Sequence, residues 1–430
     1  TDERDGDLRV KIGAISKWGD FQCELGRINL AGHEVLLWID SAEHKDLGNG
    51  FVRKAATKDK VVGWADIIIV DGTGYGEEAD RWRKEGRRVV NGSHVTDRME
   101  EDRAFGMKLA QQLGMRVPES SEFGSIREAM HHIERQPAAY AVKMSGADSP
   151  ATTLVSETSD SEDVLLQLDS FMRHPQQTQG MKAVCVQRKI KGIEIGVACW
   201  ANGNGFVQPH NIYFEHKTLM NDDVGPNTGE MGTACINLDT KSRAWSETLG
   251  LAQPLVEKIG YLGQLALGTI YDGENFWFLE FSARQGWPST HIEAELINGG
   301  YLVLFQALIG GVEPKGILRV GEWAVGVVVS APGYPWVESY EANGKALIVG
   351  GQLCGKNHLA EVKCEDGGQI VTTGTCGVIV VSVGTGTSLK SAIEKAYRNV
   401  DRVVLPNKQY RTDIGKRVLR DWKQIEALIR

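Results

Sequence analysis

The amino-acid sequence predicts a multidomain protein that combines an α/β domain, an α+β lobe and a β-rich domain. The chain has 430 residues, too many for one core of ordinary size. Residues 1–97 alternate apolar strands with polar segments long enough for crossover helices, which favours a parallel sheet. Residues 319–430 contain several short apolar strands separated by turns, which is typical of a β-rich domain.

In the N-terminal domain we expect strands at residues 8–15, 34–40 and 65–71. Glycine-rich turns follow the first and third strands, at the edge where doubly wound sheets bind ligands. Neither turn, residues 13–19 or 71–76, has the G-x-G-x-x-G spacing, so we predict no dinucleotide site. Glycines at strand ends more often only permit the turn.

The next segment predicts a helix from Asp97 to Leu113, with Asp97 or Thr96 as its N-cap and Gly114 as its stop. A small α+β lobe follows at residues 118–192. It has helices near 125–135 and 160–173, and strands at 140–144 and 183–187.

Lys143 lies in the first strand of this lobe and precedes a Gly/Ser/Thr loop at residues 145–153. Such loops present backbone N–H groups to phosphates, with a lysine as the charge partner. A half-exposed lysine that is merely solvated is the plainer interpretation. Glu194, in the strand that follows, is equally well explained as part of a surface strand with alternating charge.

A large lobe is expected at residues 193–318, which completes a central region of 98–318. Its loop at residues 223–232 packs three glycines, a proline and an Asn-Thr pair behind His216 and Lys217. That backbone freedom suits close approach to a small ligand, although a simple connector is the alternative.

The stretch Tyr271 to His291 carries the strongest chemical signal. Residues 276–282 predict an apolar strand in which Glu280 is the only carboxylate, and Arg284 follows at its end. Such a pair suits a divalent metal on the carboxylate and a phosphate on the guanidinium. For an isolated E-x-x-x-R, a strand-end salt bridge is the commoner explanation.

Composition excludes several classes of function. The net charge of −8 argues against a broad nucleic-acid footprint, and no apolar run approaches the length that spans a bilayer. We therefore expect a cytoplasmic protein without a membrane partner. Seven scattered cysteines without zinc spacing predict reduced core thiols.

Taken in order, these segments resemble the ATP-grasp ligases, and within them the phosphoribosylamine–glycine ligases. That family's D-H-K-R and D-x-G-P-N-T-G-G-M-G motifs correspond to Glu215-His-Lys-Thr218 and to residues 223–232. Its L-E-F-N-x-R-F-G-D-P-E motif corresponds to residues 279–289. Residues 331–335, 373–377 and 410–415 resemble its C-terminal domain. The resemblance implies an ATP-grasp fold with an N-terminal parallel-sheet domain and a C-terminal β-rich domain.

The resemblance also implies ATP and Mg²⁺ as cofactors and a role for each site residue. Glu280 and Ser282 would bind the metal, Arg284 would hold the terminal phosphate, and Asp223 and Asn227 would join it in catalysis. Contacts to the nucleotide would come from the remaining predicted residues: Arg103, Lys143, Gln187, Ile190, Glu194 and Lys217. Phosphoryl transfer to a carboxylate, followed by attack of an amine, would yield an amide, ADP and phosphate.

Several family motifs are altered. Ser282 replaces an asparagine, Glu230 replaces a glycine, and the lid loop A-A-G-K-G becomes residues 149–153 without its lysine. G-S-G-G-R-E-H is missing from residues 13–19, V-G-P-E becomes residues 70–73, and G-D-P-E becomes Gly286-Trp-Pro-Ser289. Ser282 would still coordinate the metal, but more weakly, and the altered lid loop would grip phosphate more weakly or in another way. Taken together, the changes concentrate on the acceptor side.

We therefore expect a small-molecule carboxylate, such as glycine, and an amine that differs from phosphoribosylamine. A modified nucleotide or base would suit Trp287. A non-catalytic ATP-binding module and a true phosphoribosylamine–glycine ligase are the alternatives, and monomer and dimer both stay open.

Overall fold

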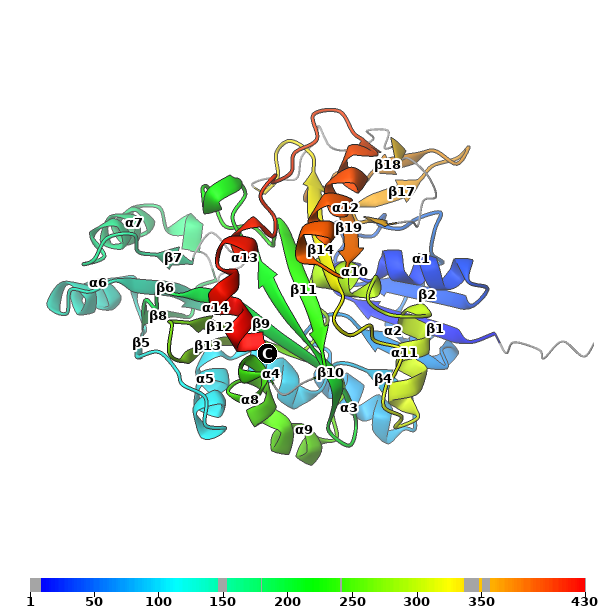
Figure 1. Ribbon diagram of the computed structural model, residues 1–430, viewed down its shortest axis with the longest axis horizontal. Helices are drawn as coiled ribbons and strands as arrows, with labels where there is room; N and C mark the ends of the chain where they lie inside the picture. Colours follow the sequence, from blue (N-terminus) through cyan, green and yellow to red (C-terminus); the bar gives the residue numbers. More distant parts are fainter. Residues whose placement is uncertain are drawn as a thin grey trace, which may run out of the picture.

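The structure is a computed structural model, and it describes residues 9–145, 153–178, 180–239, 242–335, 348–349 and 356–429. Figure 1 shows a small lobe standing out on one side of a larger body. The N-terminal sheet and the C-terminal strands lie on the opposite side of that body. The predicted polar loop at 145–153 falls largely outside the described residues.

The N-terminal sheet is parallel, with the order β2-β1-β3-β4, which confirms the predicted α/β layer. Its strands are β1 (Lys11–Ser16), β2 (Glu34–Ile39), β3 (Ile67–Val70) and β4 (Val89–Val90). The helices of this part are α1 (Gln22–Leu30), α2 (Lys58–Trp64) and α3 (Gly76–Lys84). Every residue of β3 is buried, as expected for a parallel strand covered on both faces.

The predicted helix from Asp97 to Leu113 is instead two helices, α4 (His94–Glu101) and α5 (Arg103–Gln112). Asp102 separates them because it adopts an extended conformation and its carboxylate accepts from the N–H of Phe105 as an N-cap. Ser93 forms the first N-cap, so the prediction of Asp97 or Thr96 was wrong. Gly114, with a φ of +90°, follows the second helix as predicted.

The small lobe is an antiparallel sheet of order β5-β8-β6-β7 with two helices. Its elements are β5 (Ser120–Phe123), α6 (Ile126–Arg135), β6 (Tyr140–Ser145), β7 (Leu154–Val155), α7 (Glu162–Arg173), the 3₁₀ turn η2 (Pro175–Thr178) and β8 (Ala183–Arg188). Strands and helices share one hydrophobic core separate from that of the body. The α+β lobe predicted from the sequence is therefore confirmed.

One eight-stranded sheet forms the body, with the order β13-β12-β9-β10-β11-β14-β19-β16, and its pairs are antiparallel. Its strands are β9 (Ile193–Asn202), β10 (Phe206–Glu215), β11 (Gly232–Leu238), β12 (Leu262–Tyr271), β13 (Phe276–Ser282), β14 (Trp323–Ser330), β16 (Asn357–Leu359) and β19 (Val378–Gly386). Because β11 pairs with β14, the backbone hydrogen bonds run across the predicted domain boundary at 318/319.

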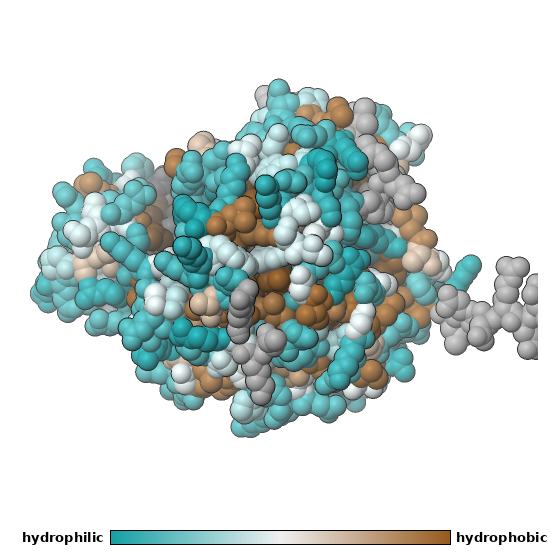
Figure 2. Space-filling model, viewed as in Figure 1, coloured by the Kyte–Doolittle hydropathy of each residue, from teal (hydrophilic) through white to brown (hydrophobic). Residues whose placement is uncertain are grey.

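Helices and short strands complete the body. They are η3 (Asn221–Asp223), α8 (Arg243–Ser246), η4 (Leu249–Ala252), α9 (Gln253–Ile259), α10 (Ser289–Ala294), α11 (Gly300–Ile309), β15 (Ile348–Val349), β17 (Val362–Cys364), β18 (Ile370–Thr372), α12 (Leu389–Asp401), β20 (Val403–Val404), α13 (Lys416–Arg420) and α14 (Trp422–Ile429). In the described part of the chain, no helix has the length and apolarity needed to cross a membrane. Figure 2 shows a mainly hydrophilic face with apolar side chains gathered toward its centre.

Candidate active site

Two cavities of similar size lie next to each other in the body. The first, of about 470 Å³, lies between the small lobe and the large sheet, and we call it the charged cavity. The second, of about 480 Å³, lies between the N-terminal sheet, α10 and the C-terminal strands, and we call it the aromatic cavity. Asn227 and Thr228 line both, so the loop at 223–232 forms their common wall.

The charged cavity gathers most of the residues predicted from the sequence. Those that line it are Arg103, Lys143, Gln187, Ile190, Glu194, Lys217, Asp223, Asn227 and Glu280. Arg284 lines the aromatic cavity instead. Ser282 is not among the described residues that line either one.

A β-bulge positions Glu280. The pairing of β12 with β13 shifts between Gly268 and Thr269, so Leu279 is an extra residue on β13. Before the bulge Phe278 points into the core, and after it Phe281 does, which places both Leu279 and Glu280 at the cavity. Strict alternation would have sent Leu279 and Glu280 to opposite faces. Ser282 lies on the same face of the strand as Glu280.

Three cations surround Glu280. Its Oε2 lies 3.6 Å from Nη2 of Arg103, and Lys143 and Lys217 are close enough to act on its charge. Burial alone would raise the pKa of Glu280, but Lys143, Lys217 and Arg103 lower it to about 2. The carboxylate is therefore ionised at neutral pH, as a metal ligand must be.

Lys217 is held by two carboxylates on the same sheet. Its Nζ lies 2.5 Å from Glu194 and 3.0 Å from Glu215. Burial would lower the pKa of Lys217, but Glu215, Glu194 and Glu280 raise it well above its usual value. Burial lowers the pKa of Lys143, although Glu280 partly opposes this. In this cavity, positively and negatively charged side chains thus lie next to one another.

The charged side chains of this cavity fit a nucleoside triphosphate with a divalent cation. Nη1 of Arg103 is buried and, among the residues described, has no hydrogen-bond partner, although guanidinium groups seek planar anions. A phosphate oxygen would accept a hydrogen bond from Nη1 of Arg103, and the same phosphate would also contact Lys143. Glu280 provides the hard oxygen ligand that Mg²⁺ prefers.

The common wall is anchored by the C-terminal part of the chain. Asp223 pairs with Nη1 of Arg411 at 3.0 Å and with Nη1 of Arg417 at 2.7 Å. Burial would raise the pKa of Asp223, but the two arginines lower it. Asp223, predicted as catalytic, is thus saturated by ion pairs, whereas Asn227 faces both cavities.

The aromatic cavity is assembled from distant parts of the chain. Its lining residues include Trp18, Asp20, His44, Arg284, Trp287, Tyr334, Glu361 and Cys376. Of the described lining residues, Arg284 is the one lysine or arginine. Its Nε lies 3.1 Å from Oε1 of Glu100, which raises the pKa of Arg284. Burial, partly opposed by Arg284, raises the pKa of Asp20 to about 6.

Sequence reasoning missed most of this second cavity. Asp20 directly follows the glycine-rich turn at 13–19, and Cys376 lies inside the T-G-T-C-G motif, so both stood beside recognised signals. His44 gave no signal, although its Nε2 lies 3.8 Å from Sγ of Cys376.

Two of the altered motifs differ in their placement. Trp287 lines the aromatic cavity. Glu230 does not: its side chain is 2% exposed and bonds to the hydroxyl of Thr233 inside the body. Glu230 was therefore wrongly assigned to the acceptor side. The altered lid loop at 149–153 lies, except for Thr153, outside the described residues.

Comparison with known proteins gives consistent results. Residues 101–290 match the ATP-grasp (A) domain of phosphoribosylglycinamide synthetase, and residues 324–417 match its C domain, which together cover about two thirds of the chain. The phosphoribosylamine–glycine ligase of Thermotoga maritima is 27% identical over 388 residues, 87% of this chain and 90% of that protein. The ligase of Listeria innocua is 24% identical over 380 residues, 85% of this chain and 86% of that protein.

Solved structures show the same fold. A crystal structure of the phosphoribosylamine–glycine ligase of Thermotoga maritima has a TM-score of 0.74 at 23% identity, covering 94% of this chain and all of that one. A biotin carboxylase–β-γ-ATP complex from Campylobacter jejuni has a TM-score of 0.65 at 13% identity, covering 97% of this chain and 96% of that one.

The fold and the charged cavity therefore define an ATP-grasp enzyme, a ligase that uses ATP and Mg²⁺ to form a C–N bond. Within that class, the chain belongs to the phosphoribosylglycinamide synthetase family.

Proposed function

We propose that this enzyme activates glycine or another small amino acid with ATP and transfers it to an amine other than phosphoribosylamine. The observation that carries the proposal is the common wall. Asn227 and Thr228 face both the charged cavity, which suits ATP, and the aromatic cavity, which suits the acceptor. A γ-phosphate and a carboxylate can meet only where the two cavities adjoin.

The residues of the two cavities have different proposed roles. Arg103 and Lys143 bind the phosphates, Lys217 and Glu194 contact the nucleoside end, and Gln187 and Ile190 receive the base. Mg²⁺ held by Glu280, with Ser282 beside it, would neutralise charge on the phosphates. Arg284 binds the carboxylate substrate in the aromatic cavity, next to the common wall. Asn227 donates a hydrogen bond from its side-chain amide to the developing acyl phosphate.

The lining of the aromatic cavity suits a planar amine as the acceptor. Trp18, Trp287 and Tyr334 line it, and aromatic rings bind planar groups by stacking. Asp20 lies in the same cavity with a raised pKa, which suits a general base that takes a proton from the attacking amine. A nucleobase or a modified nucleotide carrying an amine fits this lining.

The experiment is an ADP-release assay with purified enzyme, ATP and Mg²⁺ against panels of amino acids and of amines with and without an aromatic ring. We expect ADP release to require both a small amino acid and a planar amine, with an amide product visible by mass spectrometry. Absence of any substrate-stimulated ADP, with ATP binding intact, would sink the proposal.

The family match favours a second candidate, phosphoribosylamine–glycine ligation itself. The same assay with phosphoribosylamine and glycine decides between the two. A kcat with phosphoribosylamine and glycine that lies within the usual range of about 1–10³ s⁻¹, or no more than about tenfold below it, would favour this candidate. It would also refute a different acceptor.

A further inference from the structure

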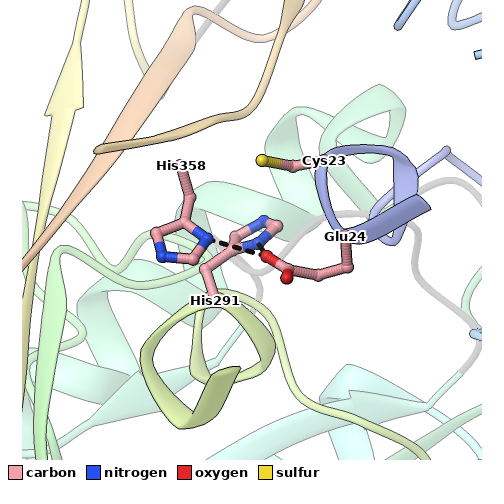
Figure 3. A group of neighbouring side chains, drawn as sticks. All are labelled: Cys23, Glu24, His291 and His358. Carbon is pink, nitrogen blue, oxygen red and sulfur yellow. Dashed lines mark hydrogen bonds and ion pairs between the residues drawn. The ribbon is translucent and has the colours of Figure 1, made fainter. Parts of the chain in front are cut away.

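Four potential metal ligands meet in the interior beside the aromatic cavity. Cys23, Glu24, His291 and His358 lie close together, and none of the four is more than 6% exposed (Figure 3). Cys23 and Glu24 come from α1, His291 from α10 and His358 from β16. The cluster therefore joins the N-terminal sheet domain, the large lobe and the C-terminal strands.

The donor atoms converge on one point. Nδ1 of His358 lies 2.7 Å from Oε1 of Glu24, and Nδ1 of His291 lies 3.1 Å from the same oxygen. The thiol of Cys23 interacts with His358. All four donor atoms lie within 4.8 Å of one another. A tetrahedral zinc site separates its donor atoms by roughly 3.3–3.8 Å, so small side-chain rotations would complete one.

A further carboxylate orients one of the imidazoles. Nε2 of His358 lies 3.0 Å from Oε1 of Glu295, which leaves Nδ1 directed at the centre of the cluster. Glu295 is itself paired with Arg27 at 2.9 Å and with Lys356. Histidines that bind metals almost always donate their second ring nitrogen to such a partner.

We propose that Cys23, Glu24, His291 and His358 bind one Zn²⁺ ion. The set of one sulfur, two imidazole nitrogens and one carboxylate oxygen is the mixture that this borderline ion prefers. With four protein ligands and no exposed position, the site is structural. It holds three parts of the chain together, and His291 also lines the aromatic cavity.

The alternative is a metal-free network in which a proton on His358 bridges Glu24 and Glu295. Burial would lower the pKa of His358, but Glu24 raises it, so this state is chemically consistent. Nη1 of Arg27 also lies 3.1 Å from Nδ1 of His358. When zinc binds, Arg27 would have to give up this contact and keep only its ion pair with Glu295. In the metal-free network Cys23 is only a hydrogen-bond partner of His358, whereas zinc would use its thiolate as a ligand. Metal binding would replace the proton.

The first test uses the full-length enzyme without an affinity tag, stripped of metal with a chelator and titrated with Zn²⁺ against a chromophoric competitor. We expect one equivalent to bind with a Kd of about 10 nM or tighter and to raise the melting temperature. A folded protein that takes up no stoichiometric zinc would overturn the proposal.

The second test identifies the ligands. With Co²⁺ in place of Zn²⁺, we expect a thiolate-to-metal charge-transfer band that Cys23→Ser abolishes. The matched control Cys199→Ser, at another buried free cysteine, should leave it unchanged. A band that survives Cys23→Ser would refute the site.

If Cys23→Ser does not fold, X-ray absorption of the zinc-loaded wild-type protein answers the same question. One sulfur at about 2.3 Å and three lighter atoms at about 2.0 Å support the site, whereas a shell without sulfur refutes it. Neither test requires ATP or an acceptor, so a failure here is separate from a failure of the proposed ligase activity.

Discussion

The charged and aromatic cavities share one wall but are built in different ways. The charged cavity draws Lys143, Glu194, Lys217 and Glu280 from strands and strand ends of two neighbouring sheets. The aromatic cavity draws Trp18, His44, Trp287 and Cys376 from four segments far apart in the chain. Regular strands hold the first set rigidly, whereas turns and loops present the second. Under the proposed function, this division would separate phosphoryl transfer in the charged cavity from acceptor binding in the aromatic cavity.

The largest effect is expected at Glu280. Glu280→Gln removes the charge of the carboxylate that we propose as a metal ligand, so ADP formation should fall by about 10²–10³-fold. Steady-state ADP release measures it, with Glu394→Gln on the exposed face of α12 as the matched control. Equal activity in both variants would contradict a metal role for Glu280.

A smaller effect is expected at Lys143, where the variant removes only one of several proposed phosphate contacts. Lys143→Met should raise KM for ATP by about tenfold, equivalent to about 1.4 kcal/mol, and leave KM for the acceptor within about twofold. Lys182→Met, exposed in the same lobe, is the control. If KM for the acceptor moved instead, the division between the cavities would be wrong.

The reciprocal change is at Trp287. Trp287→Ala should raise KM for a planar acceptor by about fivefold, because stacking on an aromatic ring contributes about 0.5–1.5 kcal/mol. KM for ATP should stay unchanged. Parallel titrations of ATP and amine measure both constants, and an effect confined to ATP would remove Trp287 from the acceptor site.

The last effect concerns stability rather than activity, and it depends on pH. Burial, reinforced by Asp20, raises the pKa of Asp71 from its ordinary value of 3.8 to about 7. The folded state then binds the proton more tightly than the unfolded state, so this group lowers the free energy of unfolding as pH rises from about 4 to about 7.

Asp71→Asn cannot titrate, while its amide oxygen can still accept from the N–H of Phe21, as Asp71 does at 3.0 Å. The variant should therefore gain about 1–2 kcal/mol relative to wild type between pH 5 and pH 8. Urea unfolding at both pH values measures the difference. A constant difference across that range would show that Asp71 is not the titrating group.

Much of the fold was predictable because its signals are local. The strand at 276–282 has the predicted bounds, and the parallel order of the first sheet follows from alternating apolar and polar segments. Nine of the residues that line the charged cavity were predicted because they stand at matching places in an ordered series of family motifs. The break at Asp102 was missed because a helix-like pattern of apolar residues continues through it.

The sequence by itself indicated the class of enzyme, through its resemblance to a known family, and nine of the residues that line the charged cavity, since motif order can be read along the chain. Only the tertiary structure decided that Arg284 faces the aromatic cavity, that Glu230 is buried, and that Glu24 meets His291 and His358. Glu24 and His358 are 334 positions apart, and no local pattern encodes such a contact. It arises because α1, α10 and β16 pack against one another, and their packing is a property of the whole fold.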